Sequence, residues 1–410
     1  MHLANYFYLA VALSLLSLSI ASLSMPAVAV GVLELPSSGA PNAVCVNGSR
    51  VYVFGFENSS GYPRLFAARL GLGGSVERVY IGGFGGFYNC VVYGDRVISV
   101  GVANSSSIAW LIAVFDAQLN LLESVVEDLT PGVDVATHVF IANNRLIVAG
   151  AGDKYGNAFI RVEERDLRSL ELLRAFNISI GKGKDYSYTL TPRGGVATLI
   201  YSVDGDAKTL TLSSDLKVLW VWDLGKGVEV LDAKWINDCL YIASKNEVLR
   251  LCSSEPSKSF YVGGGHPVAV EATGNGVAAL VLIPRYIDRC SAKLLLISKD
   301  LGTATEYTVS ENALCIHYMK PIGFAGNMAI VAVSEKGVGW RVELLQLGTA
   351  KEVDVESPVI VIPLEPFIAV VVITALALSI AVDRLMEAKQ RSDQSTNEHA
   401  ELEAQNPRHS

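Results

Sequence analysis

The chain has 410 residues, half of them hydrophobic, and a formal charge of −8 at pH 7. This negative charge argues against nonspecific binding of nucleic acid and for simple solubility. The sequence holds no C-x-x-C pair, no G-x-S-x-G elbow and no phosphate loop ending in Lys-Ser/Thr. It therefore predicts no catalytic residue, no cofactor and no metal site, so we turn to the architecture.

The N-terminus carries an apolar run, Leu9 to Ile20, that contains no charge. The small residues Ala27, Val28 and Ala29 follow it and fit the cleavage pattern of a secretory signal peptide. We therefore expect a signal peptide over residues 1–29, cleaved after Ala29. Because no Lys or Arg precedes the run, an uncleaved anchor remains the alternative.

The central region alternates short β-branched runs with Gly, Asn and Asp, a pattern typical of an all-β fold. A polar turn followed by an apolar strand recurs along it. The strands begin at Val51, Val97, Leu146, Val196, Leu240, Val277 and Ala329. Their spacing averages about 46 residues, which is the length of a four-stranded propeller blade.

One such sheet cannot cover both its faces, whereas sheets stacked in a closed ring cover one another. We therefore predict a β-propeller of seven four-stranded blades over residues 30–357. A pair of stacked sheets, or a ring of six or eight blades, remains the alternative. The last blade is expected to have its outer strand at Lys351–Glu356, with Val30–Leu35 added beside it to close the ring.

The stretch VYVFGFENSSGYPRLFAARL, from Val51 to Leu70, resembles a repeat of kelch-like and related β-propeller proteins of the prokaryotic cell surface. The resemblance covers roughly residues 42–355. The kelch double glycine and the WD dipeptide do not recur along the chain. The resemblance implies a propeller fold displayed at a cell surface.

All six cysteines fall in the predicted exterior region, which indicates disulfides. Cys239 opens the second strand of the fifth repeat and Cys252 ends its third, so we expect these two to pair. Cys45 and Cys90 hold matching positions in the first strands of repeats one and two, and they can pair if these strands approach near the axis. Cys290–Cys315 is then left by elimination among 15 pairings. Glycosylation sequons stand at Asn47, Asn58, Asn104 and Asn177.

Three histidines lie in the exterior region, His138, His266 and His317, each at or near the first strand of a repeat. First strands line the axis of a propeller, so His138 and His317 can converge as metal ligands, although isolated histidines are the favoured interpretation. An enzyme would need further polar groups at the axis. The scattered candidates for these groups are Asp134, His138, Arg161 and Glu163.

The other motifs of the exterior region are expected to be structural elements and not ligand sites. Gly152–Asn157 has some features of a calcium loop but is favoured as a hairpin tip. Ile81–Gly86 and Gly263–His266 are expected to be loops between blades. Lys217–Trp222 is expected to be a strand buried on both faces. The tryptophans are expected in blade cores rather than on a carbohydrate platform: Trp110, Trp220, Trp222, Trp235 and Trp340.

The C-terminal region holds a second apolar run, Pro366 to Val382, which predicts a transmembrane helix over residues 358–383. Basic residues follow the run and acidic ones precede it, so residues 384–410 are expected to be a cytoplasmic disordered tail and the propeller to lie outside the cell. The expected function is a membrane-anchored binding module for a surface protein or a glycan. The alternative is an extracytoplasmic propeller enzyme, such as a quinoprotein-like dehydrogenase, a lyase or a glycosidase.

Overall fold

The computed structural model describes residues 28–35, 38–58, 61–253 and 255–347. They belong to the first of two units of the chain, Met1–Thr349. Every regular element within these ranges is a β-strand, which confirms the all-β prediction. The described residues include no helix able to span a membrane. The predicted transmembrane helix and tail, and all but the last two residues of the predicted signal peptide, lie outside them.

The strands form five hydrogen-bonded sheets, and three of these hold four antiparallel strands in chain order. The three sheets are β9 (Asp134–Ala142), β10 (Arg145–Lys154), β11 (Asn157–Asp166) and β12 (Leu172–Lys182); β13 (Tyr186–Arg193), β14 (Val196–Val203), β15 (Asp206–Leu212) and β16 (Val218–Lys226); and β17 (Asp232–Ile236), β18 (Cys239–Ser244), β19 (Glu247–Cys252) and β20 (Lys258–Tyr261).

The fourth sheet has seven strands because one long strand, β5, belongs to two groups. Its first half pairs with β4 and its second half with β6. Its strands are β2 (Ala40–Asn47), β3 (Arg50–Glu57), β4 (Arg64–Gly71), β5 (Val76–Tyr93), β6 (Arg96–Asn104), β7 (Ile108–Asp116) and β8 (Leu121–Glu127). Ile81–Gly86, expected to be a loop, lies inside β5. Gly85 is needed there, because its φ is +148° and a Cβ would meet the Val102 carbonyl at 2.2 Å.

The fifth sheet joins two groups through the single pair Ala313–Glu335 between β24 and β26. Its strands are β21 (His266–Ala272), β22 (Gly276–Tyr286), β23 (Arg289–Ser298), β24 (Ala304–Leu314), β25 (Ile322–Ala325), β26 (Met328–Glu335), β27 (Gly339–Gln346) and β1 (Val28–Leu35). The N-terminal strand was expected beside an outer strand at residues 351–356; instead β1 pairs directly with β27 and takes the outer position of the last group. The outer strand expected at residues 351–356 lies outside the described residues.

The repeat read from the sequence corresponds to one strand in each group. The seven residues at which these predicted strands begin lie in β3, β6, β10, β14, β18, β22 and β26. The polar turns before them are tight hairpin turns. Asn143 and Asn144, for example, both have positive φ, as a two-residue turn of type I′ requires, and they join β9 to β10.

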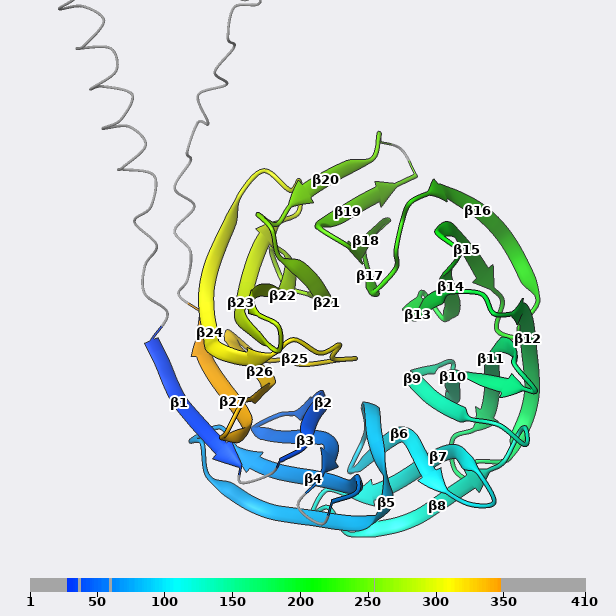
Figure 1. Cartoon of the computed structure of the whole chain (residues 1–410), viewed down its shortest axis with the longest axis horizontal. Helices are drawn as coiled ribbons and strands as arrows, with labels where there is room; N and C mark the ends of the chain where they lie inside the picture. The colour runs from blue at the N-terminus through cyan, green and yellow to red at the C-terminus, as the bar shows by residue number, and fades with distance from the viewer. Residues whose placement is uncertain (1–27, 36–37, 59–60, 254, 348–410) are drawn as a thin grey trace, which may run out of the picture. The chain divides into compact units, whose positions relative to one another are not determined.

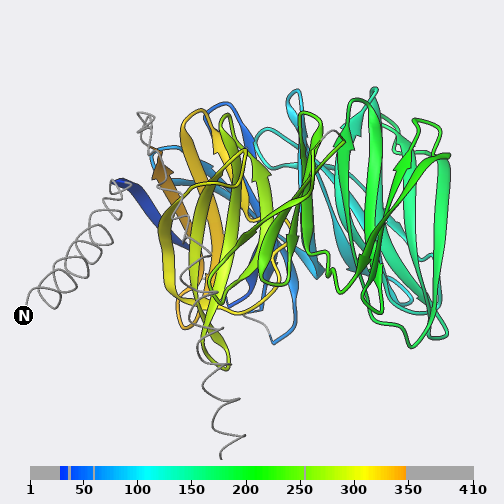
Figure 2. The ribbon, with the colours of Figure 1, turned by 90° about the horizontal axis from the view of Figure 1, so that it is seen from above.

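The groups of strands stand around a central axis, with β2, β9, β13, β17, β21 and β25 near the centre and β8, β12, β16, β20 and β24 at the rim (Figure 1). Seen from above, the strands run side by side through the thickness of the ring (Figure 2). Each core cluster packs two successive groups together. One further cluster joins Val44 and Phe66 to Ile330 and Trp340, which closes the ring between its first and last groups. This is propeller packing, and it excludes the stacked-sheet alternative.

Candidate functional site

The innermost strands bring a set of titratable side chains together near the axis, and we call this set the axial cluster. It consists of His138, Tyr188, Asp232, Lys234, Glu271, His317 and Lys320, each from a first strand of its group or from the loop before one. Its centre is the ion pair between Lys234 on β17 and Glu271 on β21, with 2.9 Å from Nζ to Oε2. The two side chains are 24% and 21% exposed, so protein surrounds them without sealing them from water.

Asp232 stands two residues before Lys234 and links three neighbouring strands. Its carboxylate accepts hydrogen bonds from the backbone N–H of Val270 on β21 at 2.9 Å and of Ala233 at 2.8 Å, and from the Thr189 hydroxyl on β13 at 3.3 Å. Burial nevertheless raises the pKa of Asp232 to about 6, against the opposing effects of Lys234 and the two N–H groups. A carboxyl group that changes charge near neutral pH therefore lies beside the ion pair.

Lys320 precedes β25 and lies on the other side of the cluster. Its Nζ donates to the Cys90 carbonyl at 3.0 Å. Burial, together with the positive charge of Lys234, lowers the pKa of Lys320 to about 8, although Glu271 and Asp232 oppose the shift. A lysine with a lowered pKa is partly neutral at mildly alkaline pH, the state in which an amine acts as base or nucleophile.

His138 is 5% exposed on β9 and belongs to a short chain of polar contacts. Its Nδ1 lies 2.8 Å from the Thr137 hydroxyl, which lies 2.7 Å from the Tyr188 hydroxyl on β13. Burial lowers the pKa of His138 to about 3, helped by the positive charges of His317 and Lys234. The imidazole is therefore neutral at physiological pH.

Of the two histidines singled out in the sequence, His317 thus lies close enough to His138 to lower the pKa of His138, and burial lowers the pKa of His317 itself. The third, His266, is placed elsewhere, with Nδ1 2.7 Å from the Lys245 carbonyl. Within the described ranges, no group of three His, Cys, Asp or Glu side chains has the arrangement of a metal site.

The other scattered candidates have structural partners away from the cluster. Glu163 is fully buried between Arg161 and Arg165, at 2.5 and 2.6 Å. Asp134 accepts the backbone N–H groups of residues 129 and 130, both at 2.8 Å. Four members of the cluster were not predicted from the sequence: Asp232, Lys234, Glu271 and Lys320. The signal in the sequence was a charged residue within an otherwise apolar first strand, such as Lys234 in AKWI (Ala233–Ile236) and Glu271 in VAVEA (Val268–Ala272).

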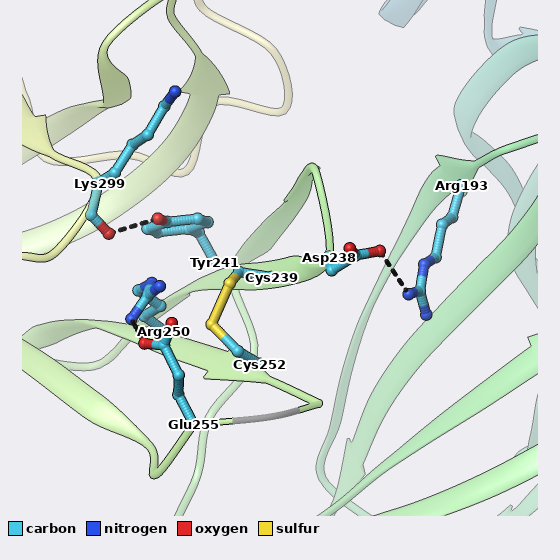
Figure 3. Close-up of a disulfide and its surroundings, with 8 residues drawn as sticks. All are labelled: Arg193, Asp238, Cys239, Tyr241, Arg250, Cys252, Glu255 and Lys299. Carbon is cyan, nitrogen blue, oxygen red and sulfur yellow. Dashed lines mark hydrogen bonds and ion pairs between the residues drawn. A yellow bond between two sulfur atoms is a disulfide. The ribbon is translucent and has the colours of Figure 1, made fainter.

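The three disulfides join the pairs named from the sequence. Cys45–Cys90 links β2 to the second half of β5, with 6.0 Å between the Cα atoms. Cys239–Cys252 joins directly opposed residues of β18 and β19 at 4.2 Å (Figure 3). Cys290–Cys315 spans 5.3 Å. Cys45–Cys90 lies at the axial cluster, since Lys320 Nζ is 3.8 Å from the Cys45 sulfur.

Most of the remaining sequence candidates lie on loops and strand ends, whereas Asn177 lies within β12. Asp153 belongs to the tip of the β10–β11 hairpin, where its carboxylate accepts the Gly156 N–H at 2.5 Å, and Gly263–Gly265 form the loop before β21. Asn58, Asn104 and Asn177 are exposed. Asn47 is half-buried and donates to the Gly94 carbonyl at 2.9 Å.

Strand β16 contradicts the expectation of a strand buried on both faces. Five consecutive large apolar residues of this rim strand are exposed, by between 41% and 65%, and we call them the β16 surface: Val218, Leu219, Trp220, Val221 and Trp222. Of the other tryptophans, Trp110 and Trp340 lie in the core as expected, and Trp235 is half-buried. The alternation was misread because a rim strand can be apolar on both faces and still face water.

The group of strands next to β16 is small. Strands β17–β20 have only four to six residues each, against nine in β16. The core cluster between the two groups is correspondingly small, with six buried residues. Rim strands β8 and β12 are also exposed along most of their length, so the exposure of β16 belongs to its position at the rim.

A small slot remains between these two groups, and Trp220, Trp222 and Trp235 line it together with three threonines, Arg193, Asp238 and Ser253. Arg193 stacks on the Trp235 ring at 4.0 Å and pairs with Asp238 at 3.4 Å (Figure 3). Two of the threonine hydroxyls are already engaged. Thr198 accepts from the Trp235 indole at 3.0 Å, and Thr209 donates to the Trp222 carbonyl at 3.2 Å.

A second pocket, of about 300 Å³, lies between β4–β5 and β7–β8. Apolar side chains such as Tyr80, Phe84 and Leu121 form most of its wall, and no charged residue lines it. The pocket can hold an apolar group, but its wall has no charged side chain that could act on such a group.

No protein-family profile matches the sequence, and comparison with curated proteins finds no significant match. Among solved structures, the chain is similar to the Dos1 propeller, with 10% identity and a TM-score of 0.50 over 79% of this chain and 97% of that one. It is similar to Sqt1 of Saccharomyces cerevisiae, with 10% identity and a TM-score of 0.47 over 79% and 100%. It is also similar to a quinoprotein alcohol dehydrogenase-like protein of Bacteroides thetaiotaomicron, with 9% identity and a TM-score of 0.46 over 66% of this chain. The match covers 66% of that protein, just under two thirds of its length.

Identities this low carry information about fold and none about function. The ring of sheets, the core clusters between successive groups and the likeness to the Dos1 propeller agree with one another. The described part of the chain is a β-propeller.

Proposed function

We propose that the protein is a binding module displayed at the cell surface, and that the β16 surface is where it binds. The observation that carries this proposal is the run of five exposed apolar residues on a rim strand. Exposed apolar edge strands promote aggregation, and natural sheets protect them with charges. A run of this kind is therefore best explained by a partner that covers it.

The proposed location rests on the disulfides and on the ends of the chain. Three disulfides favour an oxidising compartment outside the cytoplasm. The proposed layout is a signal peptide at 1–29, an exterior propeller at 30–357, a membrane helix at 358–383 and a cytoplasmic tail at 384–410. The protein would then be a single-pass protein of the cell membrane, with sequons available for glycosylation and with a surface protein or a glycan as partner.

The blade number is also part of the proposal. Dividing the seven-stranded sheet at the middle of β5, and the eight-stranded sheet at its single β24–β26 pair, gives seven groups of four strands. The last group takes β1 as its outer strand. A seven-bladed ring of the kelch-like surface type fits this division and the average repeat of about 46 residues.

Two measurements test the proposal. Protease added to intact cells should remove the propeller and leave an epitope on the tail protected; digestion of the tail would reverse the proposed topology. The double variant W220A/W222A should bind the purified envelope fraction of its own cells with an affinity at least about tenfold lower than that of the wild type. The control L122A removes an equally exposed apolar side chain from the rim strand β8. Equal binding by all three proteins would remove the β16 surface from the proposal.

The axial cluster favours a second candidate, an extracytoplasmic enzyme. Two carboxylates on neighbouring strands, a lysine with a lowered pKa and a neutral histidine are the kinds of group that act as acids and bases. A quinoprotein-like dehydrogenase, a lyase or a glycosidase would place its substrate against them. Turnover by the purified chain that disappears in K320M and E271Q, while the fold is retained, would replace the binding proposal by this one.

A further inference from the structure

We propose that the partner of the β16 surface is a second copy of this chain, whose β16 adds antiparallel to β16 and continues the sheet across a twofold axis at Trp220. This inference rests on the proposed function, because it names what covers the proposed binding surface. Strand addition of this kind uses backbone hydrogen bonds for affinity and side chains for specificity. Homodimers most often have such a twofold axis.

The first step is that β16 has an open edge. Within the described ranges its strand partner is β15, and it ends its sheet. Its backbone groups on the other side are therefore available to an incoming strand. A bulge at Leu219, which has no partner on β15, twists the strand without covering this edge. Rim strands β8 and β12 contain similar bulges, so the bulge does not distinguish β16 from them.

The second step is that β16 lacks the protection that other rim strands have. In β8 the exposed pair Leu121 and Leu122 is followed by Glu123, and in β12 Leu172 and Leu173 are followed by Arg174. Such charges oppose edge-to-edge association. In β16 five apolar residues follow one another before the first charge, Asp223.

The third step is that the apolar character of β16 favours a strand over a sugar as the principal ligand. A sugar site needs hydroxyls, carboxylates or amides that are available to the ligand. In the slot beside β16, the hydroxyls of Thr198 and Thr209 make hydrogen bonds within the protein, which leaves Thr211, Ser253 and the exposed Asp238 as its other neutral or acidic polar groups. What the surface offers is mainly apolar area on both faces of one strand, which an added strand covers.

The fourth step is that β16 complements itself. Lys217 and Asp223 stand three residues before and three residues after Trp220. In an antiparallel pair centred on Trp220, each Lys217 lies opposite the Asp223 of the other copy, and apolar residues lie opposite apolar ones between them. Opposite charges directly across two strands stabilise the pair. The existing partner of Lys217, Asp215 at 2.7 Å, leaves the lysine side chain 79% exposed and able to turn outward.

The test uses cysteine crosslinking of the full chain in cells. The described cysteines are all in disulfides, so an introduced cysteine is the one reactive thiol in that region. Residues opposite each other in an antiparallel pair have Cβ atoms about 4.5–5.5 Å apart, close enough for a disulfide after small adjustments. W220C should migrate at twice the chain mass without reductant and at the single mass with it. The control L122C, equally exposed on β8, should remain a monomer.

A second pair of variants keeps the test valid should W220C fold poorly. Chains carrying K217C and chains carrying D223C, with different tags, should form a mixed dimer when co-expressed, and neither should crosslink efficiently alone. Adding V221K should reduce crosslinking at least about tenfold, because it places a charge inside the apolar run. Monomers in both experiments, or equal crosslinking of L122C, would overturn the dimer. In that case a loss of envelope binding by W220A/W222A would still uphold the proposed function with another partner.

Discussion

The axis and the rim of this propeller depart from ordinary packing in opposite directions. At the axis, charged groups such as Asp232, Lys234, Glu271 and Lys320 are drawn in among protein atoms, where burial shifts the pKa of Asp232 and of Lys320. At the rim, β16 turns five large apolar side chains toward water. Both arrangements work against stability or solubility, since buried charges must be compensated and exposed apolar strands associate. Places where a protein departs from good packing are where function is best sought.

The two regions differ in how they tolerate change. The axial groups hold one another through an ion pair, hydrogen bonds and a disulfide, so the loss of one member affects the rest. The β16 residues make few contacts that the fold needs. Substitutions at the axis should therefore lower the free energy of unfolding, whereas substitutions on β16 should alter association alone.

The largest expected effect belongs to the axial disulfide. Cys45–Cys90 closes a span of 45 residues and Cys239–Cys252 a span of 13. Loop-closure entropy then predicts a loss of about 4 kcal/mol for C45S/C90S and about 3 kcal/mol for C239S/C252S. Chemical denaturation of the two double variants measures the difference. A greater loss for C239S/C252S would show that chain entropy does not govern these links.

The next effect concerns the central ion pair. E271A leaves the ammonium group of Lys234 without its partner, and removing one member of a largely buried pair should lower the free energy of unfolding by about 2–3 kcal/mol. The matched control is E306A, which breaks the Lys293–Glu306 pair, whose glutamate side chain is 51% exposed. This change should cost less than about 1 kcal/mol. Similar losses for both variants would contradict the contrast between axis and rim.

The pH dependence of stability should reveal two opposing axial contributions. The folded-state pKa of His138 is about 3, below its unfolded value, so the unfolded chain takes up the proton first and stability falls as the pH drops below about 6.5. The folded-state pKa of Asp232 is about 6, above its unfolded value, so its ionisation costs stability as the pH rises from about 4 to 6, and acidification restores that stability. Each of the two groups should change the free energy of unfolding by about 2 kcal/mol between pH 7 and 4.5.

Because the two contributions have opposite signs, single variants should separate them. H138Q should gain stability on acidification relative to the wild type, and D232N should lose it. Denaturant unfolding at several pH values between 4.5 and 7 measures both slopes. Slopes of the same sign in the two variants would mean that one of these pKa shifts has been assigned in the wrong direction.

The smallest effect on stability is expected at the rim. V221K places a charge on a side chain that is 62% exposed, so the free energy of unfolding should change by less than about 0.5 kcal/mol. The solubility limit of the same variant should rise, because the charge protects the strand edge. A stability loss above 1 kcal/mol would show that β16 is needed for the fold itself.

Much of the ring could be predicted from the sequence because hairpin turns and strand periodicity are local signals. The turn at Asn143–Asn144 and the anchor strand after it are readable without any distant contact. The direct pairing of Cys239 with Cys252 follows from the same local geometry.

The axial cluster could not be predicted as a set, because Asp232, Glu271 and Lys320 belong to three successive groups of strands, and the packing of these groups brings them together rather than their spacing in the sequence. The exposure of Trp220 was missed for a related reason. It depends on the position of β16 at the rim, which the packing of the whole ring decides and the sequence of this one strand does not show.

The pairing of β1 with β27 has a consequence for how the chain folds. The Ser334 hydroxyl bonds to the Gly39 carbonyl across 295 positions, so closure joins the two ends of the domain. Contacts so distant in sequence form late, because the chain loses the entropy of loop closure before these contacts stabilise it. A chain emerging from the ribosome therefore carries β1 as an unpaired strand until β27 arrives. Until then β1 and β27 both present unpaired edges, and the interval before closure is when the protein is most exposed to misassembly.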